Sequence, residues 1–167
     1  WNTIGFDDSA WRFAERAPQP RGEKRLCTVE PIDIVNELKP ISVTKTEKGY
    51  LYDFGINTAG VCRLCVRGEL DQRIELRHGE HLKAGLPDVE NIWFKREHWV
   101  RDLEYVHKDV YTCRGDGEEV YTPAFTYHGF RYVFVSGITE AQATEDLLTA
   151  LEMHSLLEER GGFSCSD

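Results

Sequence analysis

The sequence predicts an all-β fold: an antiparallel β-sandwich or jelly roll with at most one or two short helices. Short runs of alternating apolar and polar residues follow one another closely, with polar turns between them. The stretch 125–135, FTYHGFRYVFV, is largely apolar on both alternating faces, which indicates a strand in the interior of a sheet. No longer helical segments alternate with these runs, so a doubly wound α/β fold is not expected.

The length and composition are those of one globular domain. The chain has 167 residues, of which 41% are hydrophobic and 29% charged. Its net charge of -9 argues against a nucleic acid or an anionic membrane as partner, because both attract positive surfaces. No apolar run approaches the ~20 residues of a membrane-spanning helix. A neutral ligand such as a sugar is compatible with this composition.

Three regions are expected along the chain. Residues 1–25 combine aromatic anchors with a segment rich in Pro and charge, and are interpreted as the tail of a preceding β domain plus a linker. Residues 26–160 are predicted to form the sandwich. Residues 161–167, GGFSCSD, are interpreted as the start of a following domain.

Alternation defines the expected strands of the sandwich. They are residues 41–46, 49–55, 59–68, 72–80, 109–113 and 125–135. Within 72–80, Ile74, Leu76 and His78 share one face, as in a half-buried antiparallel strand. Residues 138–160 fit either a helix or a strand, and we favour a short helical turn at 140–146 followed by a strand at 147–155.

The five cysteines favour free thiols in a reducing compartment, so a cytoplasmic location is expected. Cys62 and Cys65 form a C-x-x-C pair, but the pair lies in an alternating run. Residues three apart on a strand point to opposite faces, and no second pair completes a zinc site. Neither a metal nor another cofactor is therefore expected.

Histidines raise two further possibilities. His78, Glu80 and His81 form an H-x-E-H cluster that would need another ligand, such as His98 or His107, to bind a metal. A histidine at a strand end, hydrogen-bonded to the backbone, is the preferred interpretation. His128 and Arg131 have no Ser or Cys nucleophile motif around them, so no catalytic residue is predicted. Structural hydrogen bonding is favoured for both over ligand contact.

The segment 82–108 is long for a connection between strands, and long insertions are often functional. It contains Trp93, Phe94, Trp99 and Tyr105 among basic residues. Aromatic rings could stack on the C–H face of a sugar while charged groups bind its hydroxyls. Alternatively, these rings plug one end of the sandwich. The candidate carbohydrate-binding residues are Trp93, Phe94, Trp99, His128 and Arg131.

Four sequence blocks resemble the bacterial α-L-rhamnosidases, in the order and spacing of that family. The blocks are GYLYDFGINTAGVCRLCVRG, RIELRHGEHL, YTCRGDGEEVYTPAFTYHGFRYVFVSG and HSLLEERGGFSCSD. The resemblance covers roughly residues 30–167 and is to the concanavalin-like β-sandwich that precedes the catalytic domain. Residues 5–15, GFDDSAWRFAE, are similar to the end of the family's upstream β domain. Two departures are the longer insert at 85–108 and DFGIN, at residues 53–57, where DFGQN is usual.

The resemblance implies a fragment of an inverting glycoside hydrolase that removes terminal α-L-rhamnose. The family's catalytic carboxylic acids lie on an (α/α)6 barrel that would follow residue 167, so no catalytic residue is expected in this chain. The expected function is a non-catalytic domain that braces this barrel, with the rhamnoside bound through the parent enzyme. The alternative is an autonomous carbohydrate-binding module.

Overall fold

A computed structural model describes all residues except 2, 20, 89–105, 159 and 167. Its regular secondary structure consists of β-strands. These are β1 (Ile32–Leu38), β2 (Ser42–Lys45), β3 (Tyr50–Arg67), β4 (Arg73–Gly79), β5 (Leu82–Lys83), β6 (Leu86–Pro87), β7 (Lys108–Thr112), β8 (Glu118–Tyr121), β9 (His128–Ser136) and β10 (Leu148–Ser155). The all-β prediction is confirmed.

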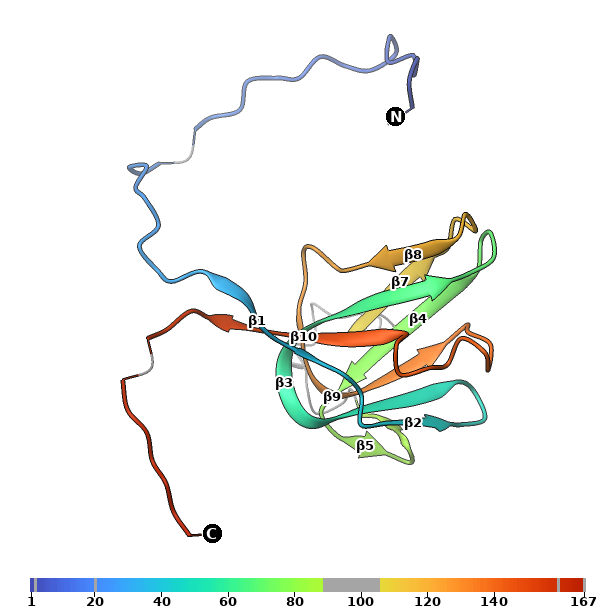
Figure 1. Ribbon diagram of the computed structural model, residues 1–167. Coiled ribbons are helices and arrows are strands. Elements are labelled where there is room, and N and C mark those ends of the chain that lie inside the picture. The colour runs from blue at the N-terminus through green and yellow to red at the C-terminus, as the bar shows by residue number, and fades with distance from the viewer. Residues whose placement is uncertain (2, 20, 89–105, 159, 167) are drawn as a thin grey trace.

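Eight of these strands form a curled antiparallel sheet whose two parts face each other, and β5 and β6 form a separate two-stranded sheet (Figure 1). One layer contains β2, the first part of β3, β9, β4 and β7. The other contains β1, β10, the second part of β3, and β8. The strand β3 belongs to both layers, as expected where a strand switches sheets at a bend.

The bend in β3 is local. Its register against β9 shifts between Asp53 and Thr58, and Gly55 within this interval has a φ of 80°. A positive φ of this kind favours glycine because it has no Cβ atom. The sequence predicted separate strands at 49–55 and 59–68, which is wrong. The irregularity bends one long strand and does not end it.

The core lies between the layers and is built from inward-facing residues of β3, β4, β9 and β10. Its wholly buried members include Tyr52, Leu64, Phe130, Val133 and Leu148. The strand β9 lies between β3 and β4, so the prediction of an interior strand at this position is confirmed.

The limits of the β9 prediction need correction. Phe125 and Tyr127 precede the strand and are exposed, although they were expected within it. Tyr132 and Phe134 are only half-buried, so the outer face of β9 is partly open.

Other elements also differ from expectation. The strands β1, β8 and the β5–β6 hairpin were not predicted. Residues 140–146 make separate turn hydrogen bonds, such as Ala143 N to the Glu140 carbonyl at 3.3 Å, and form no helix. The strand expected at 147–155 is confirmed as β10.

The described residues before β1 contain no strand, and their aromatic side chains are exposed. Phe6 and Trp11 pack edge to face with ring centroids 5.5 Å apart. The domain boundaries after residues 25 and 160 stay predictions.

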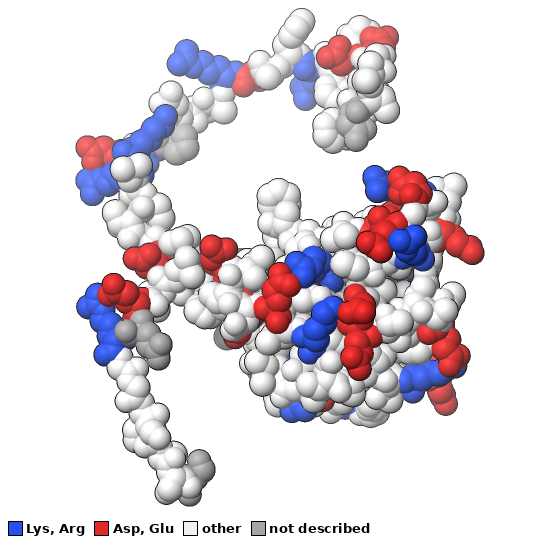
Figure 2. Space-filling view, in the orientation of Figure 1, with Lys and Arg blue, Asp and Glu red and all other residues white. Residues whose placement is uncertain are grey.

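Acidic and basic side chains lie close together on the visible face of the sandwich (Figure 2). Several form ion pairs between strands or loops, including Lys45 with Glu140 at 2.7 Å and Lys39 with Asp146 at 2.9 Å. Exposed pairs of this kind contribute little to stability. Among the described residues, no helix is long and apolar enough to cross a membrane.

Gly60 lies where β3 passes between the layers, and it pairs with both Glu152 of β10 and His128 of β9. A Cβ atom at this position would overlap the carbonyl oxygen of Leu151. We expect Gly60→Ala to lower the free energy of unfolding by roughly 1–3 kcal/mol, because backbone would have to move. Urea unfolding measures the change.

The matched control for this substitution is Gly161→Ala, since nothing lies within 4 Å of a Cβ atom there. Equal unfolding midpoints for the two variants would contradict the role given to Gly60.

Candidate functional site

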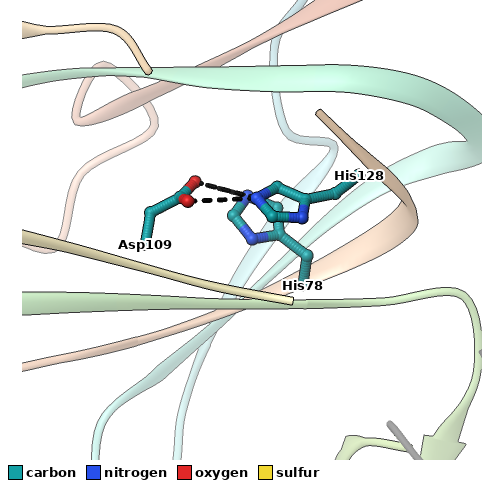
Figure 3. Close-up of side chains that lie close together, drawn as sticks. All are labelled: His78, Asp109 and His128. Carbon is teal, nitrogen blue, oxygen red and sulfur yellow. Dashed lines mark hydrogen bonds and ion pairs between the residues drawn. The ribbon is translucent and has the colours of Figure 1, made fainter. Parts of the chain in front are cut away.

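A buried polar cluster lies inside the layer that contains β4, β7 and β9. His78 comes from β4, Asp109 from β7 and His128 from the first residue of β9. Alternation along β4 buries His78 beside Leu76, and the register Leu76–Asp109 places Asp109 on the neighbouring strand. Figure 3 shows the two imidazole rings beside each other, with the Asp109 carboxylate at their edge.

The cluster is tightly packed. His128 Nε2 lies 3.1 Å from each carboxylate oxygen of Asp109, and His78 Nε2 lies 3.9 Å from Oδ2. The two rings stack with centroids 4.2 Å apart and an interplanar angle of 21°. The ring of His107 lies 5.3 Å from that of His128.

Of the two ring nitrogens of His78, only Nδ1 has a hydrogen-bonding partner among the described residues. This atom lies 3.3 Å from the carbonyl oxygen of His107, which also accepts a bond from the His78 backbone N–H at 2.8 Å. If Nδ1 carries the proton, Nε2 holds a lone pair. Burial, reinforced by nearby His128, lowers the pKa of His78 to about 3, so the ring is neutral at pH 7.

The cluster has an acid and imidazoles but no activated nucleophile. The nearby Cys62 thiol is buried, and burial together with Asp109 raises its pKa well above the ordinary value. A thiol of this kind stays protonated and unreactive at neutral pH. Imidazole nitrogen and carboxylate oxygen are, however, ligand types for divalent metals.

Arg131 forms a separate pair outside this cluster. Its Nε and Nη2 donate to the two carboxylate oxygens of Asp53 at 2.8 and 2.9 Å. Gly55 N–H also donates to Asp53 at 2.7 Å, so the pair secures the bend in β3. The Arg131 guanidinium, with the Gly55 bond, holds the pKa of Asp53 below its usual value. The guanidinium lies 5.0 Å from the ring of Tyr132.

The structure describes two of the five candidate carbohydrate-binding residues. Trp93, Phe94 and Trp99 lie outside the described residues. His128 and Arg131 are described, but each is held by a different carboxylate. Sugar contact at these five residues stays a prediction.

The H-x-E-H cluster does not assemble as a group. His78 is buried, whereas His81 is exposed and Glu80 accepts a hydrogen bond from Asn57 at 3.3 Å. The expected backbone hydrogen bond of His78 is present. The sequence analysis missed Asp109, which lies beside Val110 and Tyr111 in a short strand whose sequence is otherwise mixed in polarity.

The turn at Arg114, Gly115 and Asp116 is organised by Glu119. The Glu119 carboxylate accepts bonds from Arg114 N–H at 2.9 Å, Gly115 N–H at 3.0 Å and the Tyr111 hydroxyl at 2.7 Å. These bonds, led by that from the Arg114 backbone, lower the pKa of Glu119 to about 2. Arg114, Gly115 and Asp116 are thus part of a polar turn between β7 and β8.

Together, the two layers and the enclosed core define a β-sandwich domain of the concanavalin-like class. The family model described as "Bacterial alpha-L-rhamnosidase concanavalin-like domain" matches residues 43–154. The chain belongs to this family.

Known relatives agree with this assignment. The chain is 35% identical to an alpha-L-rhamnosidase of Streptomyces avermitilis over 93% of its length, but spans 14% of that protein. A relative of the same name from Formosa agariphila is 31% identical over the whole chain, which spans 17% of it. A solved alpha-L-rhamnosidase structure from Dictyoglumus thermophilum matches with a TM-score of 0.79 and 34% identity, covering 100% of this chain and 18% of that one.

Acid titration tests the role of Glu119. Its pKa is about 2 in the folded protein against an ordinary value of 4.5, so its ionised form favours folding above pH 4.5. This contribution is lost as the pH falls towards 2. We expect Glu119→Gln to destabilise the protein at neutral pH, and the difference from wild type to shrink on acidification.

Urea unfolding at several pH values between about 7 and 2 measures this difference. Glu118→Gln is the control, since Glu118 is the exposed neighbour of Glu119 on β8 and makes only a 3.4 Å pair with Arg67. A Glu119→Gln deficit that is independent of pH would be inconsistent with the depressed pKa.

Proposed function

We propose that this chain is the non-catalytic β-sandwich of a longer α-L-rhamnosidase that hydrolyses terminal α-L-rhamnose from glycosides. Its partner would be a catalytic (α/α)6 barrel in the same polypeptide. The observation that carries the proposal is a match along nearly the whole chain to proteins named alpha-L-rhamnosidase, of which the chain spans 14% and 17%. The remaining length of those relatives leaves ample room for a catalytic domain.

The placement of carboxylates supports a non-catalytic role. An inverting glycosidase needs two carboxyl groups about 6.5–9.5 Å apart across a cleft. Three surface pockets among the described residues are each lined by a single carboxylate: Glu47, Glu15 and Glu118 respectively. The buried carboxylates of Asp109 and Glu119 are already held by histidine, backbone and tyrosine groups.

Exposed apolar side chains support a bracing role. Ile32 and Ile34 of β1 are 57% and 46% exposed, and Leu156 and Leu157 just after β10 are 43% and 74% exposed. These residues are neighbours, because Ile32 pairs with Ser155 across the β1–β10 ladder. Covering them with a further domain would remove apolar surface from water and stabilise the contact.

The thiols support a reducing environment for the parent enzyme. Cys27, Cys62, Cys65 and Cys113 form no disulfide, and Cys62 and Cys113 are buried. A cytoplasmic location remains part of the proposal on this ground.

Activity and binding assays on the purified chain test the proposal. We expect no release of nitrophenol from p-nitrophenyl α-L-rhamnoside, with an intact α-L-rhamnosidase as the positive control. Turnover by the pure chain would overturn the non-catalytic role.

The same sample distinguishes the alternative of an autonomous carbohydrate-binding module. Under the bracing proposal, millimolar L-rhamnose should change neither the tryptophan fluorescence nor the heat of titration. Saturable quenching by rhamnose, absent with an unrelated sugar, would favour the binding module.

A further inference from the structure

The Nε2 atom of His78 is a buried polar atom that has no hydrogen-bond partner. The side chain of His78 is 0% exposed, so solvent does not satisfy this atom either. Leaving a buried polar group unsatisfied is destabilising, and native proteins seldom do so without a reason. An ion bound at this nitrogen would supply the missing partner.

Two further ligand groups converge on this nitrogen. The nearest potential ligand atoms of His78, Asp109 and His128 all lie within 4.8 Å of one another, and all three residues are buried. Figure 3 shows the carboxylate at the edge of the two stacked rings. The three side chains come from β4, β7 and β9, which are neighbours in one layer. Strands hold such groups more precisely than loops do.

The hydrogen bonding around His78 suits a metal ligand. A metal-binding histidine usually donates its other ring N–H to a carboxylate or a backbone carbonyl, which fixes the tautomer. The carbonyl of His107 occupies that position here, 3.3 Å from Nδ1. His107 has a φ of 50°, and in this conformation its carbonyl oxygen also accepts a hydrogen bond from the His78 backbone N–H at 2.8 Å. The lone pair of Nε2 is thereby left for a cation.

Metal binding would require the three side chains to rearrange. Tetrahedral Zn²⁺ with bonds of about 2.0–2.1 Å separates its ligand atoms by roughly 3.3 Å. The corresponding distances are 3.1 Å between His128 Nε2 and Asp109, and 3.9 Å between His78 Nε2 and Asp109. The rings, now 21° from parallel, would turn so that their lone pairs meet at one point. The Nε2 proton of His128 would move to Nδ1.

We propose that His78 Nε2, His128 Nε2 and the Asp109 carboxylate form a binding site for a divalent transition-metal ion such as Zn²⁺. Two imidazoles and one carboxylate match the preference of zinc for nitrogen and oxygen ligands. The ion would tie together three adjacent strands, and the burial of all three ligands indicates a structural role. This differs from the sequence-based expectation that no metal is bound, which considered His78 with His81 and did not include Asp109.

Competition between the protein and a chromophoric zinc chelator tests the site. The protein is the chain of 167 residues carrying Cys27→Ser and Cys165→Ser, since these two thiols are exposed and could bind zinc independently. We expect one equivalent of Zn²⁺ to bind and the melting temperature to rise with zinc concentration. Asp109→Asn and His78→Gln should each lower the affinity at least about tenfold.

The matched control is His154→Gln, which removes an exposed histidine of β10 and should leave zinc affinity unchanged. Circular dichroism checks that each variant is folded. If a ligand variant does not fold, ¹⁵N-histidine NMR of the parent chain decides the question, because zinc should shift the ring nitrogen signals of His78 and His128 alone.

Substitution of Co²⁺ for Zn²⁺ reports on the ligand types. We expect visible d–d absorption without a thiolate charge-transfer band. Absence of zinc binding, affinity unaffected by Asp109→Asn in a folded protein, or a thiolate band would each overturn the proposal.

Discussion

The continuity of β3 through both layers is the constraint on which the sandwich depends. Before the bend it pairs with β2, and after the bend it pairs with β8 and β10, while β9 pairs with residues on both sides of the bend. Four strands are therefore aligned by one backbone. The passage is possible because Gly55 adopts a positive φ and Gly60 lets β10 approach closely. Arg131 adds to this by holding Asp53 at the start of the bend.

Polar groups inside the sandwich are satisfied to different degrees. Glu119 is buried, but two backbone N–H groups and a tyrosine hydroxyl stabilise its charge, which is why its pKa is low. His78 is also inaccessible to solvent, but one of its ring nitrogens has a hydrogen-bond partner and the other has none in the described part of the chain. A low local dielectric strengthens the first arrangement and penalises the second. The contrast identifies the histidine cluster, and not the acidic turn, as the place where a ligand would change stability.

The sequence predicts strands well wherever one face of the strand is buried. Alternation located β4 because its inward residues, such as Ile74, are wholly buried. It left β10 open between a helix and a strand, because the first four residues of β10 are all buried. Alternation did not identify β1. This is an edge strand, and its apolar residues Ile32 and Ile34 are exposed, so the order of apolar and polar residues in β1 does not follow burial. Alternation also divided β3 in two, because glycines that normally end strands serve here to bend one.

The site was only partly predictable, for a different reason. His128 was recognised as a candidate, but its partner Asp109 lies 19 positions earlier in the chain. Their contact depends on the pairing of β4 with both β7 and β9, and strand order is not contained in local alternation. The family resemblance, by contrast, is carried by residues along the strands themselves, and the family match over residues 43–154 confirms it.

The pairing of β1 with β10 has a consequence for the architecture of a longer polypeptide. Ile32 lies opposite Ser155, so the chain enters and leaves the sandwich at neighbouring points (Figure 1). A domain whose two ends are adjacent can be inserted into a polypeptide with little displacement of the segments before and after it. A pull on the two flanking segments would also load this terminal ladder first, separating β1 from β10 before force reached the core.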